Sequence, residues 1–79
     1  MRMPNRATTL LEIAERIAEE RNRLGMSQEE LGRATHSHRN TVRHYETGER
    51  KPDPLFLAAL ENIGGDVAYV LTGTRRHPQ

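Results

Sequence analysis

Residues 28–47 of the chain read QEELGRATHSHRNTVRHYET, and this stretch decides the fold. Ser27 and Glu30 have the spacing of a capping box, which favours a helix that runs to about Thr35. A second helix is predicted over about residues 39–47, because a glycine follows as a typical C-terminal stop. The stretch therefore predicts two helices joined by a short turn.

One helix is predicted before this stretch. Thr9 and Glu12 form another capping box, and Gly25 ends the helix that follows it. Apolar residues recur along it with helical spacing, at Leu10, Ala14, Ile17 and Leu24. Residues 1–8 have no such period and are expected to form a flexible N-terminal arm.

Two helices are predicted after the stretch. Asp53 and Pro54 are typical of an N-cap and a first helical position, and Asp66 caps a short fifth helix that ends at Gly73. Residues 74–79 are interpreted as a C-terminal tail. Five helices without a strand pattern predict one all-α domain over residues 9–73. The apolar face of the fourth helix is assigned to Leu55, Phe56, Ala59, Leu60 and Ile63.

Composition excludes several classes of protein. The 79 residues suffice for one domain with a small core. The chain has no cysteine, so it can hold neither a disulfide nor a cysteine-based zinc site. No apolar run approaches the ~20 residues needed to span a bilayer, and no signal peptide is recognised, so neither a membrane protein nor a secreted protein is expected.

Charge is concentrated in the middle of the chain. The net charge is only +1, but residues 33–51 carry five basic and two acidic side chains. Eleven of the twelve basic residues are arginine, whose guanidinium group forms paired hydrogen bonds with phosphate or guanine. This pattern predicts one surface that faces an anionic partner.

Residues 28–47 resemble a helix-turn-helix, and with their surroundings they resemble the lambda-repressor-like, Cro-type (XRE) family. The resemblance is carried by LGMSQEEL at 24–31, by Thr41-Val42, Tyr45-Glu46 and Gly48, by RKP at 50–52 and by VAYVLTG at 67–73. It implies a five-helix lambda-repressor-like domain whose second and third helices form the helix-turn-helix. It also implies a sequence-specific regulator of transcription that binds double-stranded DNA, expected here to be a phage- or prophage-type repressor. Such a protein would act in the cytoplasm of a bacterial or phage-infected cell, at the nucleoid.

The third helix has an apolar edge and a polar face. At about 100° per residue, the polar side chains share an arc of about 140° that excludes Val42 and Tyr45. Arginine pairs with guanine and asparagine with adenine in the major groove. The base-contacting residues are therefore expected to be Arg39, Asn40, Arg43 and His44.

A second group of residues is expected to contact phosphates. The N-terminus of the second helix, where Gln28 lies, favours an anion, and the resemblance implies a backbone contact for this glutamine. It implies the same for Arg50 and Lys51 in the loop after the third helix, and His38 is expected to join them. These contacts would position the domain, whereas the base contacts specify sequence.

Arg21 lies on the inward stripe of the first helix, where an unpaired cation would be costly to bury. The resemblance implies an ion pair with Glu46. The alternative, that Arg21 extends outward to water, remains open.

The turn departs from the family pattern. His36 occupies a position usually held by glycine, so a left-handed backbone is expected there at a cost of about 1 kcal/mol. Because His38 stands where serine or threonine often caps the third helix, Ser37 is a candidate to cap it one residue early. The resemblance also implies that Gly32 is small because the two helices cross closely there.

A homodimer on a palindromic operator is expected, because one short helix contacts few base pairs. The candidate interface on the fifth helix comprises Val67, Tyr69, Val70 and Leu71. The alternative, that all four cover the core of the monomer, remains open.

The sequence offers little support for functions other than DNA binding. No nucleophile–base pair or glycine-rich phosphate loop is present, so the chain is not expected to be an enzyme or to need a cofactor. His44 lies on a different element from His36 and His38, and no carboxylate completes a ligand set, so no metal site is expected. An antitoxin or a protein-interaction module with the same fold, which would bind a toxin or another protein, is the remaining alternative.

Overall fold

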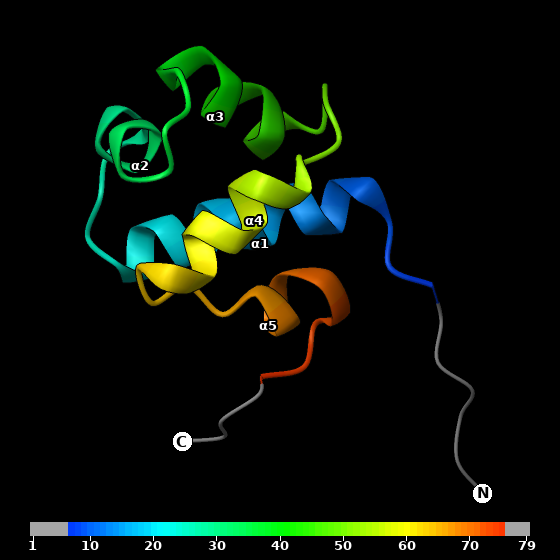
Figure 1. Ribbon diagram of the computed structural model, residues 1–79. Helices are drawn as coiled ribbons and strands as arrows, with labels where there is room; N and C mark the ends of the chain where they lie inside the picture. Colours follow the sequence, from blue (N-terminus) through cyan, green and yellow to red (C-terminus); the bar gives the residue numbers. More distant parts are fainter. Residues whose placement is uncertain (1–6, 76–79) are drawn as a thin grey trace, which may run out of the picture.

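The computed structural model describes residues 7–75, and these residues form five helices and no strand. The helices are α1 (Leu10–Arg23), α2 (Gln28–Ala34), α3 (Arg39–Thr47), α4 (Pro54–Asn62) and α5 (Val67–Thr72). The helix-turn-helix of α2 and α3 lies at one end of the molecule and α5 at the other, with α1 and α4 between them (Figure 1). The predicted all-α fold is confirmed. Most of the expected arm and tail, residues 1–6 and 76–79, lies outside the described residues.

Local hydrogen bonds explain where the helices begin. The Thr9 hydroxyl accepts from the backbone N–H of Glu12, and the Glu12 carboxylate accepts from that of Thr9. Ser27 and Glu30 form the same reciprocal pair at α2. Asp side chains cap α4 and α5. Each cap satisfies backbone donors that have no partner inside the helix, which is why these starts were predictable.

One apolar cluster holds the helices together, and every helix contributes to it. Its buried members are Ile17, Leu31, Val42, Tyr45, Phe56, Leu60 and Val70. The rings of Tyr45 and Phe56 join α3 to α4, with their centroids 4.8 Å apart. Leu55 was expected in this cluster, but it is 79% exposed. The expectation was wrong because Leu55 lies about 100° around α4 from Phe56, beyond the buried stripe.

The turn between α2 and α3 is tight. A Cβ atom on Gly32 would lie 2.7 Å from the carbonyl oxygen of Ser37, which leaves no room for a larger residue. His36 adopts a left-handed conformation with a φ of 59°, as expected. Ser37 does not cap α3: its hydroxyl donates to the Thr35 carbonyl. His38 is the N-cap, and its Nδ1 accepts from the backbone N–H of Asn40 at 3.0 Å.

Polar contacts around Glu46 connect three helices. Arg21 Nε of α1 lies 2.6 Å from Glu46 Oε2 of α3, and Arg21 Nη2 donates to Oε1 at 3.1 Å. Gln28 Nε2 of α2 donates to Glu46 Oε1 at 3.0 Å. The side chains of Arg21 and Glu46 are only 16% and 6% exposed, so Arg21 does not extend into water.

A second buried carboxylate was not predicted. Glu20 of α1 is fully buried, and it accepts hydrogen bonds from Arg23, from Arg75 and from the backbone N–H of Asp66. Burial opposes its ionisation, but these hydrogen bonds outweigh burial and lower the pKa of Glu20 to about 2. Arg75, which the sequence analysis placed in the C-terminal tail, belongs to this cluster.

Within residues 7–75, no helix combines the length and the apolar character that crossing a membrane requires.

Replacing either member of the Arg21–Glu46 pair with alanine is expected to lower the free energy of unfolding by about 3–5 kcal/mol, because the other charge stays buried without its partner. Urea denaturation followed by circular dichroism measures this change. A double-mutant cycle completes the test: additive effects of Arg21→Ala and Glu46→Ala would show that the two side chains are not coupled.

The Glu20 cluster predicts acid sensitivity. The carboxyl has its ordinary pKa of 4.5 in the unfolded chain and about 2 in the folded one, so its contribution is complete above pH 4.5. That contribution, on the order of 3 kcal/mol, is lost as the pH falls from 4.5 towards 2.

Urea titrations of the wild type and Glu20→Gln between pH 7 and pH 2.5 test this prediction. Glu20→Gln should be less stable than the wild type at pH 7. The difference between their free energies of unfolding should shrink as the pH falls. Glu29→Gln is the matched control, because Glu29 is exposed. A constant difference between wild type and Glu20→Gln across this range would contradict the prediction.

Candidate nucleic-acid interface

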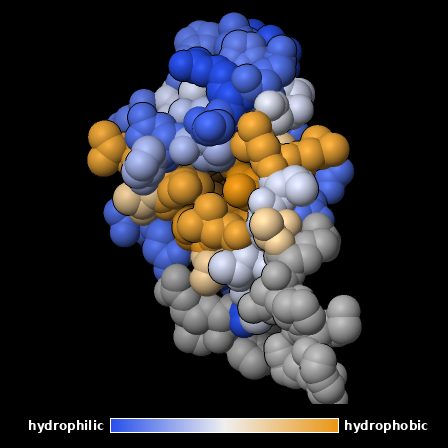
Figure 2. Space-filling model, turned by 90° about the vertical axis from the view of Figure 1, so that its right-hand side faces the viewer, coloured by the Kyte–Doolittle hydropathy of each residue, from blue (hydrophilic) through white to orange (hydrophobic). Residues whose placement is uncertain are grey.

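The polar face of α3 is open to solvent. Arg39, Asn40 and Arg43 are exposed, and hydrophilic side chains cover the end of the molecule that holds α3 (Figure 2). Among residues 7–75 none of these three side chains has a hydrogen-bond or ion-pair partner. Their donors and acceptors are therefore available to a ligand on this face. Because they project from a helix whose opposite edge is buried, their positions are fixed by the core.

His44 is placed differently from the other three. Its side chain is 31% exposed, and its Nδ1 is buried with no hydrogen-bond partner in the described part of the chain. Its Nε2 lies 3.8 Å from Glu49 Oε1. The structure thus brings His44 to the edge of the exposed face, with Nε2 as its outer polar atom. Glu49 had not been singled out, because it follows Gly48 and no helical spacing relates it to His44.

His38 lies at the N-terminus of α3, where it is exposed. Since its Nδ1 accepts the Asn40 N–H, the other ring nitrogen, Nε2, is the one that can donate a hydrogen bond to a ligand. The residue therefore combines a structural cap with a donor suited to a phosphate oxygen.

The remaining predicted phosphate contacts lie on either side of α3. Gln28 is half-buried at the start of α2, and the contact with Glu46 holds its amide in one orientation. Arg50 and Lys51 are exposed in the connection between α3 and α4, and neither has an ion-pair partner among residues 7–75. Unpaired cations next to an exposed polar helix favour an anionic ligand.

The four residues predicted as a dimer interface on α5 do not form one surface. Val70 is fully buried in the core of the monomer, so its assignment to an interface is corrected. The Tyr69 hydroxyl donates to Glu19 at 2.6 Å, and the Arg75 guanidinium lies 3.9 Å from the centre of its ring. Leu71 is 41% exposed, but it lies about 160° around the helix from Tyr69. Val67 is half-buried against the core.

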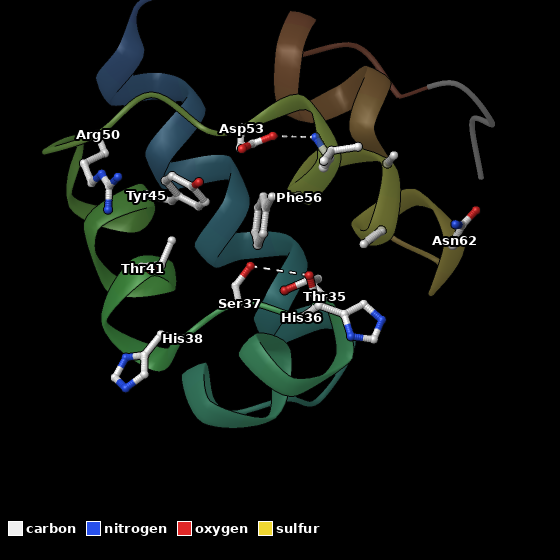
Figure 3. Close-up of a pocket in the computed structure, with 13 residues that line it drawn as sticks. Thr35, His36, Ser37, His38, Thr41, Tyr45, Arg50, Asp53, Phe56 and Asn62 are labelled. Atoms are coloured by element: carbon white, nitrogen blue, oxygen red, sulfur yellow. Dashed lines mark hydrogen bonds between the residues drawn. The ribbon is translucent and has the colours of Figure 1, made fainter.

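A groove between α3 and α4 was not predicted. It has a volume of about 670 Å³ and runs from the α2–α3 turn to the connection before α4 (Figure 3). Tyr45 and Phe56 contribute to its apolar wall, and Arg50 lies at its edge. The helical spacing of Leu55, Ala58 and Asn62 could have indicated this groove. Leu55 had been assigned to the core instead.

Within residues 7–75, no three histidine, aspartate or glutamate side chains are grouped so that they could hold a metal ion.

Comparisons with known proteins agree with this geometry. The family model HTH_3, described as helix-turn-helix, matches residues 17–67. The chain is similar to the P22 c2 repressor protein solved in complex with a synthetic operator, with 26% identity and a TM-score of 0.71 over 85% of this chain and 100% of that one.

Two other solved structures are also similar. The restriction-modification controller protein C.AhdI from Aeromonas hydrophila has 22% identity and a TM-score of 0.69, over 77% of this chain and 94% of that one. The clp gene regulator ClgR from Corynebacterium glutamicum has 22% identity and a TM-score of 0.71, over 84% of this chain and 72% of that one. No curated protein sequence matches the chain. The family model matches more than half of the chain, and the five helices have the lambda-repressor-like arrangement. The chain therefore belongs to the XRE-type helix-turn-helix family of DNA-binding transcriptional regulators.

Proposed function

We propose that this regulator is a repressor of the phage or prophage type, which binds a palindromic operator as a homodimer in the cytoplasm, at the nucleoid. The observation that carries the proposal is the α3 face itself. Arg39, Asn40 and Arg43 are exposed and unpaired within the described residues, while Glu46 of the same helix is bound to α1 and α2. The likeness to the P22 c2 repressor supports the same function.

In this proposal α3 enters the major groove. Arg39 and Arg43 each present a guanidinium group that can pair with the N7 and O6 atoms of guanine. The Asn40 amide can pair with N6 and N7 of adenine. His44 contributes one hydrogen bond through Nε2, since its Nδ1 is buried. These four residues would specify the sequence.

The DNA backbone is held on both sides of α3. Gln28 and His38 lie at the N-termini of α2 and α3, where free backbone N–H groups and the helix dipole favour a phosphate. Arg50 and Lys51 reach the backbone from the α3–α4 connection. Together these four residues would fix the register of the domain on the duplex without reading bases.

A homodimer follows from the small size of one recognition helix. The nine residues of α3 reach only a few base pairs, whereas specific binding needs a larger contact area. Two copies about a twofold axis would double the contacts and would match half-sites about one helical turn apart. Two exposed leucines offer surfaces for this pairing, Leu71 on α5 and Leu55 on α4.

The base contacts can be tested on an operator selected from a random DNA pool. Alanine at Arg39, Asn40, Arg43 or His44 is expected to cost about 1–3 kcal/mol of binding free energy on that operator and little on random DNA. Fluorescence anisotropy titrations at one salt concentration measure both. Arg33→Ala is the matched control, because Arg33 is an exposed arginine of α2 that pairs with Glu29. Equal losses on the two DNAs for all four variants would refute the assignment.

The phosphate contacts have a different signature. Arg50→Ala and Lys51→Ala are expected to weaken binding to all sequences alike, because each variant releases one counterion fewer from the DNA when it binds. The slope of log K against log salt should become shallower by about one unit for each variant. Titrations of operator and random DNA over a range of salt concentrations measure the slope. An unchanged slope in both variants would remove these residues from the backbone contact.

A further inference from the structure

One exposed carboxylate lies among the residues proposed to contact DNA. Glu49 follows α3 directly after its glycine C-cap, and Arg50 and Lys51 are the next two residues. The Glu49 side chain is 57% exposed, so the core does not require it. A carboxylate beside a duplex repels the phosphates and weakens binding to every DNA sequence. This cost is offset only if the carboxylate improves recognition in another way.

Glu49 is held against the last turn of α3. Gly48 has a φ of 82°, a left-handed conformation that turns the chain back at the end of the helix. The backbone N–H of Glu49 donates to the His44 carbonyl at 3.0 Å, and the Glu49 carboxylate accepts from the Thr47 hydroxyl at 2.9 Å. In this arrangement Glu49 Oε1 lies 3.8 Å from His44 Nε2. The carboxylate is thus fixed next to the outer nitrogen of the ring.

The inner nitrogen of the His44 ring supplies a second, independent observation. His44 Nδ1 is the one buried side-chain nitrogen or oxygen without a hydrogen-bond partner in the described part of the chain. The proton of a neutral histidine is ordinarily placed by a hydrogen bond at one of the two ring nitrogens. At His44 Nδ1 makes no such bond, and within residues 7–75 Glu49 is the only carboxylate within 4 Å of the ring nitrogens. The placement of the proton therefore depends on Glu49.

We propose that Glu49 is a positioning residue that keeps the His44 proton on Nε2. This inference rests on the proposed function, in which His44 contacts a base. An N–H at Nε2 places its positive end near the carboxylate, which is favourable at 3.8 Å even though this distance is too long for a hydrogen bond. A proton on Nδ1 would instead bury an N–H without an acceptor and leave the bare Nε2 lone pair beside an anion. Both effects favour the same tautomer.

The position of this proton decides which bases His44 accepts as partners. With the proton on Nε2, the outer atom of the ring is a donor and requires an acceptor on the base. In the major groove guanine, adenine and thymine each present an acceptor, whereas cytosine presents only its N4 amino group. His44 therefore discriminates against cytosine. A bare Nε2 would accept a hydrogen bond from cytosine N4, so loss of the Glu49 charge would relax this discrimination.

Nitrogen NMR of the free protein tests the tautomer without DNA. At about pH 8, where an ordinary imidazole is neutral, the ¹⁵N shifts of the ring distinguish the nitrogen that carries the proton from the one that does not. The His44 signals are identified by their absence from the spectrum of His44→Gln. The wild type should carry the proton on Nε2, and Glu49→Gln should show a larger share of the Nδ1 tautomer. A wild-type proton on Nδ1, or identical His44 shifts in the two proteins, would overturn the inference.

Affinity measurements on the selected operator test the consequence for recognition. The base read by His44 is the one at which His44→Ala no longer distinguishes the four bases. Cytosine at that position should weaken wild-type binding by about 10- to 100-fold, and this penalty should be about three- to tenfold smaller for Glu49→Gln. Glu49→Gln should bind random DNA at least as tightly as the wild type, because it lacks a negative charge. Glu15→Gln, which removes an exposed carboxylate of α1, is the matched control and should discriminate as the wild type does.

Failure of the inference and failure of the proposed function give different results. If the wild type binds no DNA, the proposed function fails, and the ring spectrum still decides whether Glu49 places the proton. If the wild type binds and Glu49→Gln keeps the full penalty for cytosine, DNA binding stands and the role of Glu49 is overturned. An equal loss by Glu49→Gln on operator and random DNA would also overturn it, because Glu49 would then serve the fold or the backbone contact.

Discussion

The Glu46 carboxylate belongs to α3, yet its hydrogen-bond donors come from Arg21 of α1 and Gln28 of α2. A chain of 79 residues buries too little apolar surface for packing alone to fix the angles between its helices. Charge-assisted hydrogen bonds are directional, so they select one arrangement where apolar contacts would tolerate several. The orientation of α3 relative to the rest of the domain depends on this carboxylate. The three unpaired side chains on the outer face of α3 are therefore presented at fixed positions, which a ligand that reads hydrogen bonds requires.

The helices could be predicted from sequence because their signals are local. Thr9 and Ser27 each have their capping partner three residues away, so both capping boxes can be recognised in the sequence without knowledge of the fold. The buried Glu20 could not be predicted in this way. It stands next to Glu19 in the same helix, and what distinguishes it is Arg75, which lies 55 residues away in the sequence. Leu55 was misplaced for a related reason: α4 is apolar on more than one side, and periodicity alone cannot tell a core stripe from an exposed one.

The distinction between local signals and contacts of distant segments also applies to the candidate site. Arg39, Asn40 and Arg43 could be assigned to one open face because Val42 and Tyr45 anchor the opposite edge of a single helix. The α5 assignment failed for Val70, since the sequence shows that Val67, Tyr69, Val70 and Leu71 are apolar or aromatic without showing how α5 is rotated against α1. In the structure that rotation is set by Asp66, whose backbone N–H is held by Glu20, and by Tyr69, which reaches Glu19. Contacts between distant segments decide which residues of a short helix are free.

The link between Arg75 and Glu20 has a practical consequence for labelling the protein. It holds the chain against α1 two residues after α5 and its glycine C-cap have ended, on the side of the molecule away from α3 (Figure 1). A fluorophore or affinity tag joined after this arginine would start on the face remote from the helix-turn-helix, and so would interfere little with a duplex bound there. A version shortened to end at Gly73 would instead leave a fully buried carboxylate with one arginine fewer. The segment after α5 would then lose its contact with α1, even though every helix was retained.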